Sequence, residues 1–242
     1  RLALVWDASH SITAKLLAGR AFRAPSFNEL YAINNPVNKG NPALKPETND
    51  TREAAVSWQA RTDLQLNVNV FRYTMKNIIR AVANTPGSTL TTYKNSGDQT
   101  GRGFELETVW DVSRKLRLTA NYSHQSALDL ATQTDAGYAP HDKLYVRGDW
   151  RFTGRWLTSA QVNRVAERKR ASGDIRPDVP DDTTVDLTVR TERSKGGWDF
   201  AGSIRNLFDA QVYEPSLAPG TAIPNDLPQA RRSFYLQATR SL

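Results

Sequence analysis

The sequence of 242 residues predicts an all-β fold of antiparallel strands. Apolar and polar residues alternate with a period of two in many segments, and helical periodicity is sustained over three turns in none. Residues 116–123 are the clearest case, because the even-numbered positions are apolar or aromatic and the odd-numbered positions are polar. One face of such a strand requires lipid or a protein core, and the other requires water.

Eleven strands are predicted, most of them near the ~9–11 residues that a tilted strand needs to cross a bilayer. They are residues 1–8, 12–22, 50–60, 63–75, 102–111, 115–126, 141–152, 155–166, 183–193, 197–206 and 231–242. Short turns at about 9–11, 61–62, 112–114, 153–154 and 194–196 alternate with long segments at 23–49, 76–101, 127–140, 167–182 and 207–230. Outer-membrane barrels have short periplasmic turns and long extracellular loops. We therefore predict an antiparallel transmembrane β-barrel wall.

The tryptophans give an independent indication, because indole rings favour the membrane interface. All lie within about five residues of a predicted short turn, which predicts a membrane-interface girdle at one rim. The girdle comprises Trp6, Trp58, Trp110, Trp150, Trp156 and Trp198. The alternative is a soluble β-sandwich with buried tryptophans, which should be scattered between both strand ends.

Phe71 and Tyr73 depart from the alternation of the segment 64–70 that precedes them. They switch to the polar face, which predicts either a β-bulge or aromatic side chains that fill the lumen.

Composition excludes several other classes. The sequence has no cysteine, which argues against a disulfide-stapled fold and against Cys-ligated zinc. No run of about 18 apolar residues is present, so a transmembrane helix is excluded. The net charge is +7, but only residues 168–170 form a basic cluster, so no nucleic acid partner is expected.

The strand count indicates a fragment. The chain begins at Arg1 without a methionine or a signal peptide, and eleven strands place the two ends of the chain on opposite sides of the membrane. Bacterial single-chain barrels have even strand numbers, and half a barrel would leave two unpaired edges in lipid. Residues 1–242 are therefore interpreted as the C-terminal portion of a larger barrel.

No catalytic constellation is found in the sequence. It contains no Gly-x-Ser-x-Gly elbow, phosphate loop or dinucleotide fingerprint, so neither enzyme activity nor a cofactor is expected. The three histidines, at positions 10, 124 and 141, lack metal-ligand spacing, and no metal site is expected. His141, next to Asp142, is interpreted as a solvated loop histidine.

Several motifs resemble those of the TonB-dependent outer-membrane receptors. GRAFRAPSFNELY at 19–31 and GNPALKPE at 40–47 are similar to the signature in the middle of that family's barrel. YKNSG at 93–97 with GRGFELE at 101–107 resembles a later strand entry, and RNLFD at 205–209 resembles the last hairpin. Prolines and glycines in these motifs end strands and permit turns, so a structural role is favoured over ligand contact.

The resemblance implies a 22-stranded barrel that imports a scarce solute, with a ferric siderophore as the first expectation and cobalamin, haem or an oligosaccharide as others. It also implies a plug domain and contact with the TonB complex through an N-terminal region, neither of which lies in this chain. Outer-membrane lipid and lipopolysaccharide are further expected partners. A passive porin and a soluble carbohydrate-binding β-protein are the competing functions.

The candidate ligand-binding residues are aromatic and cationic side chains of the long segments, which can stack on or pair with a chelate. They are Arg80, Tyr93, Tyr138, Arg168, Lys169, Tyr213 and Arg231. Acidic residues surround the basic cluster at 168–170, which favours a neutralised, solvated loop there. Four cations predicted to face the lumen are expected to meet an internal domain, namely Lys143, Arg147, Arg151 and Arg190.

Overall fold

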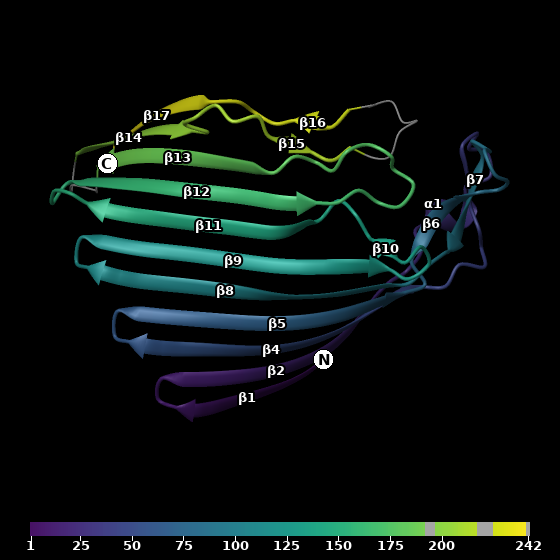
Figure 1. The fold of residues 1–242 in the computed structure, drawn as a ribbon, viewed down its shortest axis with the longest axis horizontal. Coiled ribbons are helices and arrows are strands. Elements are labelled where there is room, and N and C mark those ends of the chain that lie inside the picture. Colours follow the sequence, from purple (N-terminus) through teal and green to yellow (C-terminus); the bar gives the residue numbers. More distant parts are fainter. Residues whose placement is uncertain (192–196, 217–224, 241–242) are drawn as a thin grey trace.

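In a computed structural model that describes residues 1–191, 197–216 and 225–240, eleven long strands form one antiparallel sheet in chain order (Figure 1). The strands are β1 (Leu2–Ser9), β2 (Ile12–Arg23), β4 (Glu47–Arg61), β5 (Leu64–Lys76), β8 (Gln99–Ser113), β9 (Leu116–Asp129), β11 (Pro140–Arg151), β12 (Trp156–Arg168), β13 (Asp182–Thr191), β14 (Trp198–Arg205) and β17 (Ser233–Arg240). A short twelfth strand, β10 (Thr134–Asp135), pairs with β9. The predicted strand number and order are confirmed.

The connections alternate as predicted, with short turns at one end of the sheet and long segments at the other (Figure 1). The predicted turn at 194–196 and the end of the predicted last strand, at 241–242, lie outside the described residues. Towards the long connections several strands extend about three residues further than predicted: β4 begins at Glu47, β8 begins at Gln99, and β9 ends at Asp129. Backbone pairing continues there although the hydropathy pattern has ended.

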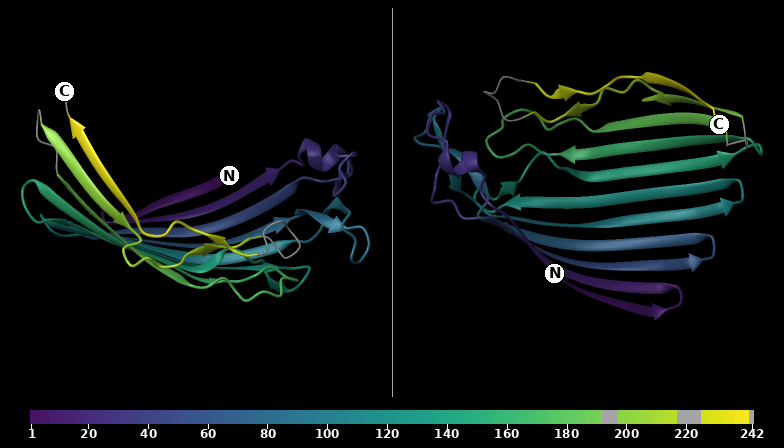
Figure 2. Two further views of the ribbon diagram at one scale, coloured as in Figure 1. Left: turned by 90° about the horizontal axis from the view of Figure 1, so that it is seen from above. Right: turned by 180° about the vertical axis from the view of Figure 1, so that it is seen from behind.

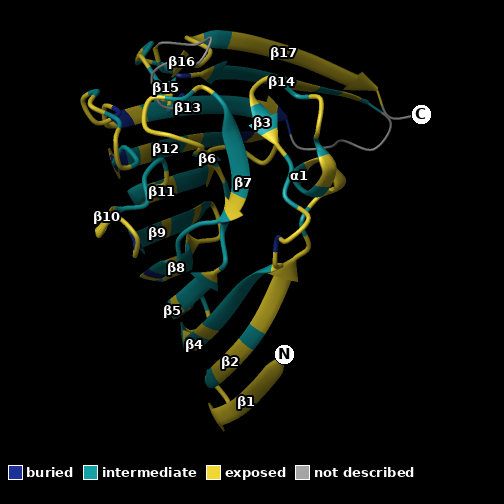
Figure 3. Cartoon of the chain, turned by 90° about the vertical axis from the view of Figure 1, so that its right-hand side faces the viewer, coloured by how far each residue is buried: buried dark blue, intermediate teal, exposed yellow. Residues whose placement is uncertain are grey.

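The sheet is a single curved layer (Figure 2). β1 and β17 form its edges and are exposed along nearly their whole length, whereas the central strands are half-buried (Figure 3). Within the described residues the buried apolar set is small and consists of Leu44, Ile79, Leu157, Ala166 and Val179. The sandwich alternative is therefore wrong, because the long strands enclose no dry interior between two sheets.

The strand register divides the sheet into two faces. Cross-strand partners share a face, and all six tryptophans fall on the same one, which we call the apolar face. The opposite face, the polar face, carries Asn67 and Asn69 of β5. Val68 and Val70 are exposed whereas those asparagines are half-buried. The lower exposure of the polar face is expected if this face is the concave side of the curved sheet, where side chains crowd together.

The long connections contain secondary structure that the alternation pattern did not predict. The first includes a short helix, α1 (Phe27–Tyr31), and β3 (Asn38–Lys39), which joins β6 (Ile79–Ala83) and β7 (Thr91–Asn95) in a three-stranded sheet. Near the C-terminal end, β15 (Tyr213–Glu214) pairs with β16 (Leu227–Pro228). Among the described residues, no helix is long and apolar enough to span a membrane.

The bulge suggested for Phe71 and Tyr73 is absent, because the pairing of β5 with β8 is regular there. Phe71 faces Gly103, and Tyr73 faces Gly101. A Cβ atom at Gly101 would lie 2.3 Å from the Tyr73 ring, and one at Gly103 would lie 2.6 Å from the Phe71 ring. The two glycines thus make room for aromatic rings that cover the polar face, as the second alternative predicted.

Candidate functional site

The first two long connections are joined by an ion cluster at the end of β2. Arg23 donates from Nε and Nη2 to the Glu47 carboxylate at 2.7 and 2.8 Å, and from Nη1 to the two oxygens of Glu29 at 3.1 and 2.9 Å. Glu29 also accepts from the backbone N–H of Ser26 at 2.6 Å, which closes a capping box on α1. Ile79 N donates to Glu47 at 2.8 Å, so the cluster also holds the start of β6.

Two of the motifs bind each other. Asn95 Nδ2 donates to the carbonyls of Lys45 and Asn77 at 2.9 and 2.7 Å, and Lys45 N donates back to Asn95 Oδ1 at 2.8 Å. Asn41 Nδ2 donates to the carbonyl of Tyr93 at 3.0 Å. The residues of GNPALKPE and YKNSG therefore join the first long connection to the second, which supports the predicted structural role. We call residues 23–47 and 77–97 the loop platform.

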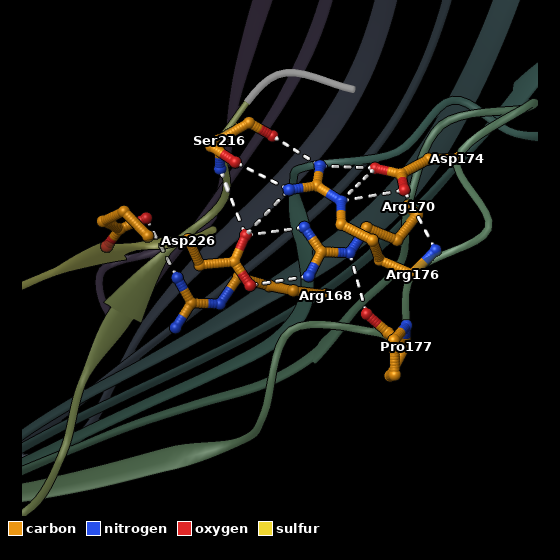
Figure 4. Close-up of polar contacts among 8 residues, drawn as sticks. Arg168, Arg170, Asp174, Arg176, Pro177, Ser216 and Asp226 are labelled. Atoms are coloured by element: carbon orange, nitrogen blue, oxygen red, sulfur yellow. Dashed lines mark hydrogen bonds and ion pairs between the residues drawn. The ribbon is translucent and has the colours of Figure 1, made fainter. Parts of the chain in front are cut away.

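A second cluster joins the connection after β12 to the connection after β14 (Figure 4). Arg170 forms a bidentate ion pair with Asp226 at 2.7 and 2.6 Å and also donates a hydrogen bond to the carbonyl of Pro177. Arg176 bonds Asp174 at 2.6 Å and Ser216 Oγ at 2.8 Å. We call residues 168–182, 214–216 and 226 the arginine cluster.

Arg168 is the most enclosed arginine of this cluster. Its side chain is 3 % exposed and pairs with Asp182 and, at 2.9 Å, with Glu214. The interpretation of residues 168–170 as a solvated loop is therefore wrong for Arg168 and also for Arg170, whose side chain is 7 % exposed. The predicted neutralisation is confirmed, but two of the carboxylates that provide it, Glu214 and Asp226, lie 46 and 56 residues away in sequence.

The seven candidate residues lie at the end of the sheet that carries the long connections, but they do not converge on one pocket. Four are cations that already have carboxylate partners: Arg80 with Asp129 at 2.5 Å, Arg168 as above, Lys169 with Asp178 at 2.9 Å, and Arg231 with Asp209 at 2.8 Å. Three are half-buried tyrosines: Tyr93 in β7, Tyr138 beside Lys169, and Tyr213 in β15. Sequence reasoning did not select Arg170, Arg176 or Asp226.

His141 is not a solvated histidine. Its side chain is 16 % exposed, and Nε2 lies 2.7 Å from the Asp135 carboxylate. His124 Nδ1 lies 2.9 Å from the Asp142 carboxylate, which Tyr122 also contacts through its hydroxyl group at 2.5 Å. Within the described residues, no group of three or more histidine, aspartate or glutamate side chains is arranged to hold a metal ion.

Three of the four predicted lumen cations come together on the polar face. Arg147, Arg151 and Arg190 line a hollow of about 320 Å³ near the short turns, together with Asp149. Asp149 is bonded to Arg147 at 2.8 Å. Lys143 lies elsewhere, in a hollow between the middle parts of β8, β9, β11 and β12.

Comparison with known proteins identifies the family. The family model described as TonB dependent receptor-like, beta-barrel, matches residues 1–207. The chain belongs to this family. Receptors of this family lie in the outer membrane, which confirms the predicted location of the chain.

Among curated proteins, the TonB-dependent receptor chain is similar to the metal-pseudopaline receptor CntO of Pseudomonas aeruginosa, with 27 % identity over 78 % of this chain and 28 % of that protein. It is also similar to the vitamin B12 transporter BtuB of Vibrio vulnificus, with 25 % identity over 84 % of this chain and 31 % of that protein. The chain therefore spans less than a third of the length of these curated relatives.

Solved structures share the fold. The copper transporter OprC superposes with a TM-score of 0.80 at 16 % identity, covering 99 % of this chain and 38 % of that chain. The ferric enterobactin receptor PfeA of Pseudomonas aeruginosa, in a mutant form bound to enterobactin, also gives 0.80, at 19 % identity, covering 98 % of this chain and 40 % of that chain.

The tryptophans of this receptor chain follow a line that crosses the sheet obliquely. Trp6 pairs across β1 and β2 with a residue that in turn pairs with Val56 of β4, so Trp6 and Val56 are level in the sheet. Trp58 lies two residues beyond Val56, towards the short turns. Trp110 likewise lies two residues closer to the short turns than the residue of its strand that is level with Trp58. The same shift of two residues is found for Trp150 relative to Trp110, and for Trp156 relative to Trp150. Strands of a barrel are tilted, so side chains at one membrane depth must shift in register from strand to strand. The line has the geometry that an interfacial girdle requires.

The arginine cluster should resist acid. Hydrogen bonding by the Arg176 guanidinium lowers the pKa of the Asp174 carboxyl to about 2. Because a lowered pKa favours the folded state only while the carboxyl is ionised, this contribution is complete above about pH 4 and is lost as the pH falls through about 2. NMR titration of the Asp174 carboxyl carbon should give a midpoint near 2, and Arg176→Leu should move it towards about 3.9. Lys169→Leu should leave the midpoint in place, and an unchanged midpoint in Arg176→Leu would contradict this assignment.

Proposed function

We propose that this chain supplies the C-terminal part of the wall, and the extracellular loops, of a receptor that binds a scarce solute and imports it with energy delivered through TonB. The observation that carries the proposal is the arrangement of all the described long connections at one end of a curved sheet with a polar inner face. The solute is a metal chelate, with a ferric siderophore first. The names of the metal-pseudopaline receptor and the enterobactin-bound receptor support that class.

We infer different roles for the seven candidate residues. Tyr93, Tyr138 and Tyr213 present aromatic surface from three different long connections and are the proposed solute contacts. Arg80, Lys169 and Arg231 are at least 37 % exposed in their side chains and can exchange a carboxylate partner for an anionic chelate. Arg168 holds the loops together, because its guanidinium group is buried among its partners.

The basic hollow of Arg147, Arg151 and Arg190 is the proposed contact for an internal plug domain, which would be encoded outside this chain. Its position on the polar face near the short turns suits a domain that fills the barrel interior. A passive porin would need no such domain, and its transport would continue without TonB. In either case the proposed role is transport, without catalysis.

The test is uptake of radiolabelled iron chelates by iron-limited cells that carry the full-length receptor. Uptake should require both the receptor gene and TonB. A triple variant with Tyr93→Ala, Tyr138→Ala and Tyr213→Ala should take up at least about tenfold less at low chelate concentration, because aromatic contacts of this kind contribute about 2 kcal/mol each. Uptake that persists without TonB would favour the porin. Unchanged uptake by the triple variant, with normal amounts in the membrane, would refute the assigned contacts.

A further inference from the structure

Three arginines stand side by side on the apolar face. Arg52 of β4 is directly paired with Arg72 of β5, which is directly paired with Arg102 of β8. All three are exposed, and they share the face of the tryptophans, since Arg52 is an even number of residues from Trp58 in the same regular strand. Directly opposed side chains in a sheet lie about 5 Å apart at Cβ, so the three charges form one compact row.

The protein has few negative charges near this row that could compensate its positive charge. Like charges directly opposite each other destabilise a sheet. Among the described residues, no carboxylate forms an ion pair with any of the three guanidinium groups. Asp50, in the adjacent row of the same face, is held by Arg20 at 2.6 and 2.8 Å. Asp50 also lies close to Arg52 in the same surface hollow, but a single carboxylate leaves this part of the face with a net positive charge that an anion outside the sheet can neutralise.

The position of the row along the strands indicates where that counter-charge lies. Six residues separate Arg52 from Trp58, and eight separate Arg102 from Trp110. At about 3.3 Å per residue these separations are about 20–26 Å along the strands, and in strands tilted by about 35–45° they correspond to about 14–22 Å of membrane depth, within an apolar band of about 25 Å. The same interval of eight residues separates Trp156 from Arg164 and Trp150 from Asp142. The row thus lies in the outer part of the apolar band, on the side of the long connections, from which the long arginine side chains can extend to the headgroup region.

We propose that Arg52, Arg72 and Arg102 bind the headgroup of an outer-leaflet glycolipid that carries two or more phosphate charges. This inference rests on the proposed depth of the tryptophans in the membrane, and it is independent of the imported solute. Arg52 and Arg72, but not Arg102, line a surface hollow of about 820 Å³. The same hollow is lined by Arg20, Lys76, Thr74 and Asp50, the carboxylate partner of Arg20, so cations outnumber the carboxylate. Guanidinium groups bind phosphate oxygens through paired hydrogen bonds, and three adjacent cations match a multiply charged headgroup better than a single phosphodiester.

The test is native mass spectrometry of the full-length receptor in detergent with added lipid. The variant is Arg52→Gln, Arg72→Gln and Arg102→Gln combined. The matched control combines Arg61→Gln, Arg114→Gln and Arg155→Gln, which remove three exposed charges at the short-turn end. The unaltered receptor and the control should retain diphosphorylated lipid A, and the variant should retain at least tenfold less. A receptor with lysine at the same three positions should recover part of the retention, because ammonium groups keep the charge but not the paired hydrogen bonds, and this recovery separates loss of charge from loss of fold.

Three outcomes would overturn the proposal. Equal retention by the variant and its control would show that the row does not bind the lipid. Equal retention of diphosphorylated lipid A, monophosphorylated lipid A and phosphatidylglycerol by the unaltered receptor would show that multiple phosphate charge is not recognised. Failure of the lysine-substituted receptor to recover retention, despite normal insertion, would exclude charge recognition. Membrane fractionation of each protein identifies a failure of insertion, which would contradict the membrane position instead.

Discussion

Replacing Gly40 with alanine should dismantle the loop platform. A Cβ atom at this position would lie 2.5 Å from the backbone nitrogen of Ala32 and 2.7 Å from both the carbonyl carbon and the carbonyl oxygen of Leu30. Those are backbone atoms at the C-terminal end of α1 and cannot be displaced as the tip of a flexible side chain can. Overpacking of this kind costs about 1–3 kcal/mol and sometimes more, and the rigid surroundings place Gly40→Ala at the upper end.

Proteolysis of intact cells that carry the full-length receptor would measure this effect. Gly40→Ala should make residues 23–47 and 77–97 at least about tenfold more susceptible to an added protease, which corresponds to about 1.4 kcal/mol of lost local stability. Gly154→Ala is the matched control, because a Cβ atom there meets no atom within 4 Å. Equal susceptibility of the two variants would contradict the role assigned to Gly40.

Arg168→Leu should have the second large effect, by leaving the Asp182 carboxylate without its cation. The Asp182 side chain is 6 % exposed, so water cannot replace the lost partner. Removing one member of a buried ion pair destabilises a protein by about 3–5 kcal/mol. We expect the connections after β12 and β14 to separate and to exchange their backbone hydrogens rapidly.

Lys169→Leu is the control for this prediction, because it changes the neighbouring residue and removes the same charge. The Lys169 side chain is 42 % exposed, and exposed ion pairs contribute about 0–1 kcal/mol. Hydrogen exchange followed by mass spectrometry should show loss of protection in residues 168–182 for Arg168→Leu only. Matching exchange in the two variants would mean that burial of Arg168 does not stabilise the cluster.

The barrel wall could be predicted from the sequence because its determinants are local. In β9, the apolar and polar residues of the segment 116–123 alternate, which indicates directly which side faces lipid and which faces water. The first residues of β4 and β8 were missed because Thr48, Asn49 and Thr100 carry no such contrast, although their backbones still pair. The three-stranded sheet in the loops was missed for a related reason, since its strands have only two to five residues and come from two connections.

The candidate site was less predictable, because its interactions join distant segments. The abundance of acids around residues 168–170 correctly indicated neutralisation of charge. It could not indicate burial, which depends on Asp226 and Glu214 in another connection. The motif residues were correctly interpreted as structural, but the bonds from Asn95 to Lys45 and Asn77 become visible only in three dimensions.

Thiol labelling tests most directly whether the strands cross the outer membrane with their long connections outside. The chain has no native cysteine, so single cysteines can be placed at Thr85 and Ser172 in long connections and at Arg114 and Gly154 in short turns. A membrane-impermeant maleimide added to intact cells should label the first two positions, and the other two only after the outer membrane is permeabilised. Labelling of the short turns in intact cells, at the rate found for Thr85 and Ser172, would contradict the transmembrane arrangement.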